Sequence, residues 1–340
     1  MMTSGRTGKL SLGWCLILAV LPLVTALAAL GIGRIWIPPR DVFTAIEEVF
    51  TGANTLPVLT RMTLWKLRLP RILLAALVGA GLSTAGCAFQ SLFANPLATP
   101  DTLGVASGAC FGAALGLLLG LGLMGVQLAA LVMGGVAVTL TFLAGSGKNR
   151  GLSTIVLSGI MMGSLFSALV SLVKFAADEE SQLPAITYWL MGSLGSAAYG
   201  TLALGAPPIL LGIAILFLLR WRMNLLPLSE DEARSSGVNI RRLRSVTVAC
   251  ATMITASCVS MCGQVGWVGL LIPHICRMKF GSNHLSLLPA AISLGACFMI
   301  LVDTAARSVS AQEIPVSILT AIIGAPFFIL LMRKTGGWSL

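Results

Sequence analysis

Charged residues are scarce in this sequence of 340 residues, where Asp, Glu, Lys and Arg together make up 10%. Soluble globular domains carry about 25% charged residues and roughly 45–50% apolar ones, whereas the apolar share here is 56%. So few charges could not cover the water-facing surface of a chain this long. The scarcity therefore excludes a soluble enzyme, a disordered protein and a nucleic-acid-binding module, and it indicates a polytopic membrane protein.

Motifs for catalysis and metal binding are scarce as well. The eight cysteines form no CxxC pair, which argues against a zinc site or a disulfide framework, and we expect them to pack between helices. Gly145-Ser146-Gly147-Lys148 lacks the first glycine of a phosphate-binding loop, and Gly120–Gly125 fits GxGxxG only between two apolar runs. No HExxH, GxSxG or paired-carboxylate motif occurs. The chain shows no evident catalytic apparatus and is not expected to hydrolyse ATP by itself.

Long apolar runs dominate what is present. Crossing a bilayer takes about 20 apolar residues, and in lipid an unbroken apolar run satisfies its backbone polar groups as a helix. We therefore predict an all-α fold of about ten spans, which cover residues 12–32, 72–93, 103–122, 124–144, 152–173, 201–219, 246–264, 265–280, 287–305 and 314–332. The first run is too long for the apolar region of a typical signal peptide, so we expect it to remain as the first span rather than to be cleaved.

The distribution of basic residues predicts the orientation. With both termini in the cytoplasm, 14 of the 22 Lys and Arg residues fall in inner segments, as the positive-inside rule favours. Six of the eight exceptions lie in one long outer segment, residues 33–71. Within it, Arg68 and Arg71 flank Pro70 at a helix start, and Arg307 could join them. These arginines either anchor the chain at the membrane interface or dock an acidic partner; Asp303 also lies one turn before Arg307, at the spacing of an ion pair.

Three inner or buried features have two readings each. The insertion at about 220–245 is either a solvated loop or a short helix that serves as a platform for another protein. In the second case Ser229 is the N-cap of the helix and Gly237 ends it. The short link 95–100 contains two prolines and is either a gate or a simple turn. Five glycines at four-residue spacing from Gly104 to Gly120 lie on one predicted helix face, which packs either inside the subunit or against another subunit.

These segments together resemble the permease subunits of ATP-driven importers for iron–siderophore complexes, haem and vitamin B12, the FecCD or vitamin B12 permease family. The resemblance covers about residues 10–335. The matching stretches are Arg68-Leu69-Pro70-Arg71, Gly79–Gly86 with Gln90, Asn95-Pro96-Leu97-Ala98, Leu103-Gly104 with Ser107-Gly108, Trp189 with Gly192-Ser193, Glu230–Arg241, Gly269–Arg277 and Glu313–Phe328. One departure is Asn283-His284-Leu285, where many relatives have Asp-His-Arg, and we assign no role to it.

The resemblance implies a single permease domain, residues 1–340, with the type II ABC importer permease fold in a bacterial cytoplasmic (inner) membrane. The implied partners are two ATPase subunits that hold ATP and Mg²⁺, a second permease copy or a paralogue, an outer substrate-binding protein, and membrane lipid. No cofactor, metal, nucleic acid or catalytic residue is expected on this chain. An ion-coupled secondary transporter is the alternative, and a channel-like membrane protein is a third reading. Which of iron–siderophore, haem, cobalamin or molybdate is carried stays open.

The resemblance also implies roles for particular residues. Docking of the binding protein is assigned to Arg68, Arg71 and Arg307. Coupling to the ATPase is assigned to Glu230, Asp231, Glu232, Ala233, Arg234, Ser235, Gly237 and Val238. The cytoplasmic gate is assigned to Asn95, Leu97 and Ser146.

Overall fold

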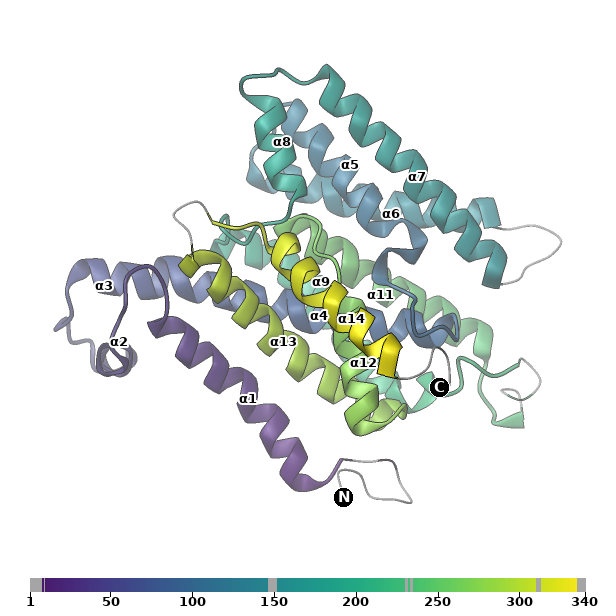
Figure 1. Cartoon of the computed structure of the whole chain (residues 1–340), viewed down its shortest axis with the longest axis horizontal. Helices are drawn as coiled ribbons and strands as arrows, with labels where there is room; N and C mark the ends of the chain where they lie inside the picture. The colour runs from purple at the N-terminus through teal and green to yellow at the C-terminus, as the bar shows by residue number, and fades with distance from the viewer. Residues whose placement is uncertain are drawn as a thin grey trace.

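The computed structural model describes residues 8, 10–145, 152–229, 232, 235–309 and 313–334, and within these ranges it contains helices and no β-strand (Figure 1). The predicted all-α fold is confirmed. The helices are α1 Leu12–Gly31, α2 Pro39–Thr51, α3 Val58–Met62, the π-helical turn η1 Thr63–Arg68, α4 Leu69–Leu92, the 3₁₀ turn η2 Pro100–Leu103, α5 Val105–Leu118, α6 Leu123–Gly145, α7 Leu152–Ala176, α8 Gln182–Leu190, α9 Tyr199–Met223, α11 Ile240–Cys262, α12 Val268–Phe280, α13 His284–Val309 and α14 Val316–Lys334.

Each of the ten predicted spans falls on one of these helices, but the helices differ in length. Among the described residues, seven helical segments are long and apolar enough to cross a membrane, and α5 and α14 are shorter apolar helices. The spans expected at 103–122 and 265–280 are shorter than predicted. Left-handed glycines end α5 on both sides, and Gly263 and Trp267 at positive φ separate α11 from α12. At about 1.5 Å per residue, α5 and α12 are each about 20 Å long, less than the ~30 Å hydrocarbon layer.

Helix α4 forms the centre of the bundle. It packs against α9, α11, α12 and α13. Within the helical segment Val58–Leu92 that contains α4, 83% of the most apolar 18 residues are buried. Helices α5, α6, α7 and α8 form a second group beside it, as Figure 1 shows. Two polar contacts fix the direction of α13: Asp303, near its C-terminal end, meets the start of α4, and its first residue, His284, meets the end of α4 at Ser91. Helices α4 and α13 are therefore antiparallel neighbours.

Glycines allow α4 to approach its neighbours closely. A Cβ added at Gly79 would lie 2.1 Å from the backbone oxygen of Gly295 on α13, and one at Gly86 would lie 1.9 Å from that of Gly269 on α12. The glycines of α5 act in the same way, since Gly108 and Gly112 face α6. This supports packing inside the subunit. The prediction that five glycines share one helix face is wrong, because Gly104 and Gly120 lie outside α5 in left-handed turns.

We expect Gly79→Ala to destabilise the bundle by about 1–3 kcal/mol, because the new methyl group overlaps a backbone atom that cannot rotate away. Gly135→Ala is the matched control, since nothing lies within 4 Å of a Cβ there, and helix propensity alone favours alanine by up to about 1 kcal/mol. Thermal unfolding in detergent measures both variants. Equal unfolding temperatures would contradict this account of the α4–α13 contact.

The other packing predictions have mixed outcomes. All eight cysteines are free; seven of them are buried as expected, whereas Cys15 is exposed. His274 is buried with its ring 5.9 Å from that of Phe328, so it serves as a contact between α12 and α14.

Candidate functional site: an arginine cluster and the opposite end of the bundle

The start of α4 brings two arginines to one helix end. Pro70 lies in the first turn of α4, directly after the π-helical turn η1, where the helical hydrogen-bond pattern changes. Arg68 and Arg71 are three residues apart and therefore project from the same side of the chain. Both are buried, with exposed fractions of 5% and 8%.

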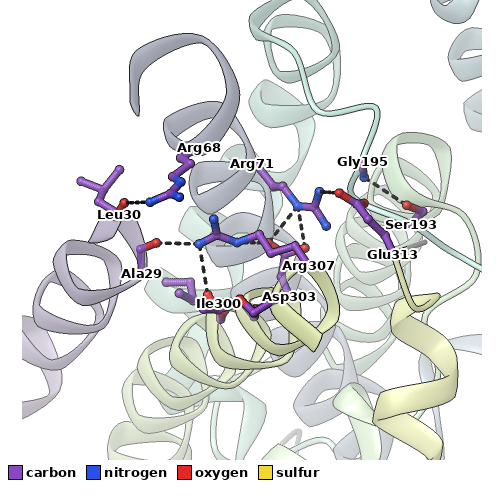
Figure 2. A network of polar contacts seen from close by, with 12 residues as sticks. Ala29, Leu30, Arg68, Arg71, Ser193, Gly195, Ile300, Asp303, Arg307 and Glu313 are labelled. Carbon is purple, nitrogen blue, oxygen red and sulfur yellow. Dashed lines mark hydrogen bonds and ion pairs between the residues drawn. The ribbon is translucent and has the colours of Figure 1, made fainter. Parts of the chain in front are cut away.

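Arg71 binds two carboxylates from distant parts of the sequence (Figure 2). Its Nε donates to both oxygens of Asp303, at 2.8 and 3.0 Å, and its Nη1 donates to Glu313 Oε1 at 2.7 Å. Asp303 is fully buried on α13, whereas the side chain of Glu313 is 34% exposed. Arg71 therefore joins α4 to α13 and to the segment that leads into α14.

The other two arginines are held mainly by backbone oxygens. Arg307 Nη2 donates to Ala29 O at 2.5 Å, and its Nε lies 3.8 Å from Asp303 Oδ2, which confirms the predicted ion pair one turn apart. Arg68 donates to the carbonyl oxygens of Leu30 and Ile35. The end of α1 thus closes over the arginines, as Figure 2 shows for Ala29 and Leu30.

We call Arg68, Arg71, Arg307, Asp303 and Glu313 the arginine cluster. Its three cations face two carboxylates, so the cluster carries one positive charge in excess. All three arginines and Glu313 line a cavity of about 260 Å³. The sequence predicted that these cations either anchor the chain at the membrane interface or dock a partner, and the structure places them below the surface with internal partners. An acidic group can approach them through this cavity.

At the other end of α4, a histidine joins three segments. His284 Nε2 lies 2.6 Å from Ser91 Oγ, and its Nδ1 lies 3.0 Å from Oδ1 of Asn224, which follows α9. Asn224 Nδ2 also donates to Asn283 Oδ1 at 3.1 Å. The sequence suggested no role for this Asn-His pair. The structure gives it a structural one, tying the ends of α4 and α9 to the start of α13.

The segment between α9 and α11 agrees with the predicted capping pattern where it is described. The backbone N–H and the hydroxyl of Ser229 donate to Glu232 Oε2 at 3.0 and 2.9 Å, and these bonds lower the pKa of the Glu232 carboxyl. Gly237 has a φ of +72°, as expected for a helix stop. Glu232, Ser235 and Gly237 are exposed and Val238 is half-buried. The predicted coupling residues Glu230, Asp231, Ala233 and Arg234 lie outside the described residues.

This segment also borders a groove of about 520 Å³ between α9 and α11. Arg222 and Arg242 stand at the groove, and Gly237 and Val238 form part of its lining. Asn239 caps α11 by accepting a hydrogen bond from the N–H of Arg242 at 3.1 Å, a cap that the sequence reasoning missed although Asn before an apolar helix is a known signal.

The proline-containing link is a compact turn. Asn95 Oδ1 accepts from the N–H of Leu97 at 2.9 Å, and the preceding Ala94 has a positive φ of 47°. Asn95 and Leu97 are both exposed at this end of α4. Ser146, the third predicted gate residue, lies outside the described residues. The gate assignment therefore remains a prediction.

Asp101 is a polar residue that the sequence reasoning missed. Its Oδ1 accepts from the N–H groups of Ala106 and Ser107, at 3.0 and 3.4 Å, and so caps the start of α5. Burial raises the pKa of this carboxyl to about 6 despite those bonds. It borders a cavity that hydroxyl groups of Thr99, Thr102, Ser107, Ser164 and Ser167 also line.

The raised pKa of Asp101 predicts a pH-dependent contribution to stability. A carboxyl whose folded pKa exceeds its unfolded value stabilises the fold below pH 4, and that contribution is lost as pH rises through about 6. We expect it to be about 1–3 kcal/mol. Asp101→Asn keeps an oxygen acceptor without the charge, so it should gain stability relative to the wild type between pH 4 and pH 7. Parallel unfolding curves at both pH values measure this, and a constant difference would contradict it.

Within the described ranges no group of three or more His, Cys, Asp or Glu side chains is placed to hold a metal ion. Seven apolar helical segments among the described residues, of which the one containing α4 is central and glycine-packed, define the chain as a multi-pass membrane protein. The chain belongs to the FecCD transport family, which it matches over residues 20–334.

Curated relatives match almost the whole chain. The molybdate import system permease protein MolB of Haemophilus influenzae is 42% identical, over 93% of this chain and 94% of its own. A probable iron chelatin transport system permease protein of Helicobacter pylori is 36% identical, over 95% and 97%. The vitamin B12 import system permease protein BtuC of Escherichia coli is also 36% identical, over 95% of each chain. The relatives make this chain an ABC transporter permease.

Solved structures agree. A metal-chelate type ABC transporter in an inward-facing conformation superposes with a TM-score of 0.85 at 40% identity, and the match covers 95% of this chain and 99% of the other. PsaBC from Streptococcus pneumoniae has a TM-score of 0.58 at 15% identity, over 86% of this chain and 95% of the other, and it shares the fold alone.

Proposed function

We propose that this chain is the membrane-spanning subunit of a binding-protein-dependent ABC importer with about ten transmembrane helices and both termini in the cytoplasm. Two ATPase subunits supply the energy from ATP and Mg²⁺, and a second permease copy or a paralogue completes the pathway. The cargo is a metal chelate, such as an iron–siderophore, haem or cobalamin, or it is molybdate. The complex lies in a bacterial inner membrane.

The separation of two polar sites supports this proposal most strongly. The arginine cluster lies at the start of α4, and the Ser91–His284 contact and the neighbouring end of α9 lie at its other end. A helix of 24 residues spans about 36 Å, which is enough to cross a membrane. In this proposal the docking site lies at one end of the α4–α13 pair, and the gate and the neighbouring coupling segment lie at the other end. That is the arrangement needed to pass a signal between a binding protein and an ATPase.

The outer site fits an acidic partner. Buried arginines attract carboxylates strongly because they are poorly solvated, and the cluster has one positive charge more than its own carboxylates neutralise. Arg68, Arg71 and Arg307 line a cavity that a single side chain could enter. We assign these three arginines to docking of the substrate-binding protein.

The inner site fits the ATPase. We assign coupling to the segment that contains Glu230, Asp231, Glu232, Ala233, Arg234, Ser235, Gly237 and Val238. Glu232, Ser235 and Gly237 are exposed, and the segment lies between α9 and α11, which both pack against α4. Asn95, Leu97 and Ser146 are assigned to the cytoplasmic gate at the same end of α4. Movement of the coupling segment would tilt α9 and α11, and alternating access follows from two packed arrangements of the helices.

An ion-coupled transporter is less well supported. Such a protein uses an ionisable group within the membrane to carry its ion. Asp303 is the natural candidate, but Arg71 binds both of its oxygens and Arg307 lies 3.8 Å away. Asp303 therefore serves to hold α4 and α13 together rather than to bind a transported ion.

Co-purification tests the subunit assignment. The tagged chain, extracted from its native membrane in mild detergent, should bring down an ATP-binding subunit in a one-to-one ratio. Recovery of the chain without any ATPase, under conditions in which a known importer keeps its own, would contradict the proposal.

A further inference from the structure

We infer that Glu313 is an internal substitute for the docking carboxylate: it occupies Arg71 while no partner is bound, and an acidic side chain of the docking protein takes its place. This inference rests on the proposed docking role of the arginine cluster. It adds an exchange step that links docking to the segment leading into α14.

The two carboxylates on Arg71 are held very differently. Asp303 is 1% exposed, receives two hydrogen bonds from Arg71 Nε, and also faces Arg307. Glu313 is 34% exposed and is joined to Arg71 through a single bond between Nη1 and Oε1. Breaking a buried pair is costly, whereas a partly exposed pair is weak. Glu313 is therefore the carboxylate that can leave.

The position that Glu313 occupies is also the one an entering acid must reach. Glu313 lines the same cavity as the three arginines and its side chain is 34% exposed, so it is the accessible partner of Arg71; Figure 2 shows the bond between the two. Arg68 already donates to two backbone oxygens, those of Leu30 and Ile35. Arg71 differs, because its Nη1 donates to the carboxylate of Glu313, which an incoming carboxylate can replace. Two carboxylates at that one nitrogen would repel each other, so entry of one favours departure of the other.

Departure of Glu313 from Arg71 would free the segment that leads into α14. Glu313 lies three residues before Val316, the first residue of α14, and Val316 N donates to Gly192 O at 2.9 Å. A Cβ built at Gly195 would lie 2.9 Å from Glu313 Oε2, so this segment also lies against the α8–α9 connection, as Figure 2 shows. The bond to Arg71 ties α4 to both segments. Its exchange releases that tie without disturbing the pair between Arg71 and Asp303.

Substitution of Glu313 by glutamine tests the exchange. Glu313→Gln keeps the shape and removes the competing charge, so it should tighten binding of the cognate binding protein to the complete transporter in lipid nanodiscs by about threefold to fivefold at low salt. Glu179→Gln is the matched control, because it removes the same charge from an exposed position in the connection between α7 and α8. We expect it to change the dissociation constant by less than about twofold.

A double-mutant cycle separates exchange from long-range charge. In an Arg71→Gln background the gain from Glu313→Gln should vanish. Arg71→Lys serves as the second background, because a lysine keeps a charge beside Asp303 without the fork that reaches both carboxylates. Unfolding temperatures verify that each variant is folded.

Each outcome has one meaning. If Glu313→Gln tightens binding of the binding protein equally with and without Arg71, the exchange is overturned, since the effect would then be electrostatic at a distance. Tightening no greater than that of Glu179→Gln would overturn it as well. In both cases the docking role would still stand if Arg68→Glu weakens binding. If Arg68→Glu leaves binding unchanged, the docking role itself fails.

Discussion

Replacing residues 230–237 by a Gly/Ser stretch of equal length is expected to abolish ATP-driven uptake while the permease still folds and inserts. The physical reason is that this segment connects α9 and α11, with Glu232, Ser235 and Gly237 exposed, and both helices pack against α4. Buried residues anchor each side of it, Met223 and Leu226 before and Ile240 after, so the bundle should keep its unfolding temperature. Uptake into proteoliposomes and ATP hydrolysis, measured on the same sample, check the expectation.

The control replaces a comparable exposed segment that lies away from this connection. Residues 178–181 lie between α7 and α8 and include three acidic side chains, all of them exposed. A Gly/Ser stretch there should leave uptake near the wild-type rate. Normal uptake by the 230–237 variant would reject the coupling assignment. Equal loss in both variants would show that any loop change is harmful and would reject it too.

Reversing one charge in the arginine cluster should weaken docking strongly. Arg68 is the cleanest position, because its donors go to backbone oxygens and no carboxylate of the cluster depends on it. Arg68→Glu converts the one excess positive charge into an excess of one negative charge, so an acidic partner meets repulsion instead of attraction. We expect the dissociation constant of the binding protein to rise about 10- to 100-fold at low salt, since a lost buried pair costs about 2–5 kcal/mol and part of that is screened.

Two further variants keep the docking test interpretable. Arg40→Glu makes the same charge change at an exposed position on α2 and should weaken docking far less. Arg68→Gln removes the charge without reversing it and should give an intermediate value, which guards against misfolding of the reversal. Unchanged affinity of Arg68→Glu at low salt would refute the docking role.

Sequence reasoning was successful where the signal is local. The scarcity of charge and the long apolar runs predicted helices at every position where a span was expected. The Asp303–Arg307 pair follows from a four-residue spacing. Ser229 as N-cap follows from its residue type just before acidic residues, and the N–H of Glu232 donates to its hydroxyl oxygen at 3.4 Å. Such patterns involve neighbours along one helix, so they need no knowledge of the fold.

It failed where the partners are far apart in sequence or where a turn interrupts an apolar run. Arg71 is 242 residues from Glu313, and no periodicity connects them. Nothing in the sequence therefore indicated that the fold buries the arginines beneath the end of α1. The lengths of α5 and α12 were also overestimated, because hydropathy counts a left-handed Gly104 or Trp267 as part of the run that it ends. Asp101 was missed for a related reason. It caps α5 because of the 3₁₀ turn η2, and the residue types of that segment do not reveal this turn.

The most direct measurement of the central claim is uptake into proteoliposomes containing the permease, with and without its ATPase subunits. The cognate binding protein would be loaded in turn with a radiolabelled ferric siderophore, haem, cobalamin and molybdate. The account predicts accumulation of one of these cargoes only when ATPase, Mg²⁺ and ATP are all present. Uptake of the same cargo by the permease alone would contradict it.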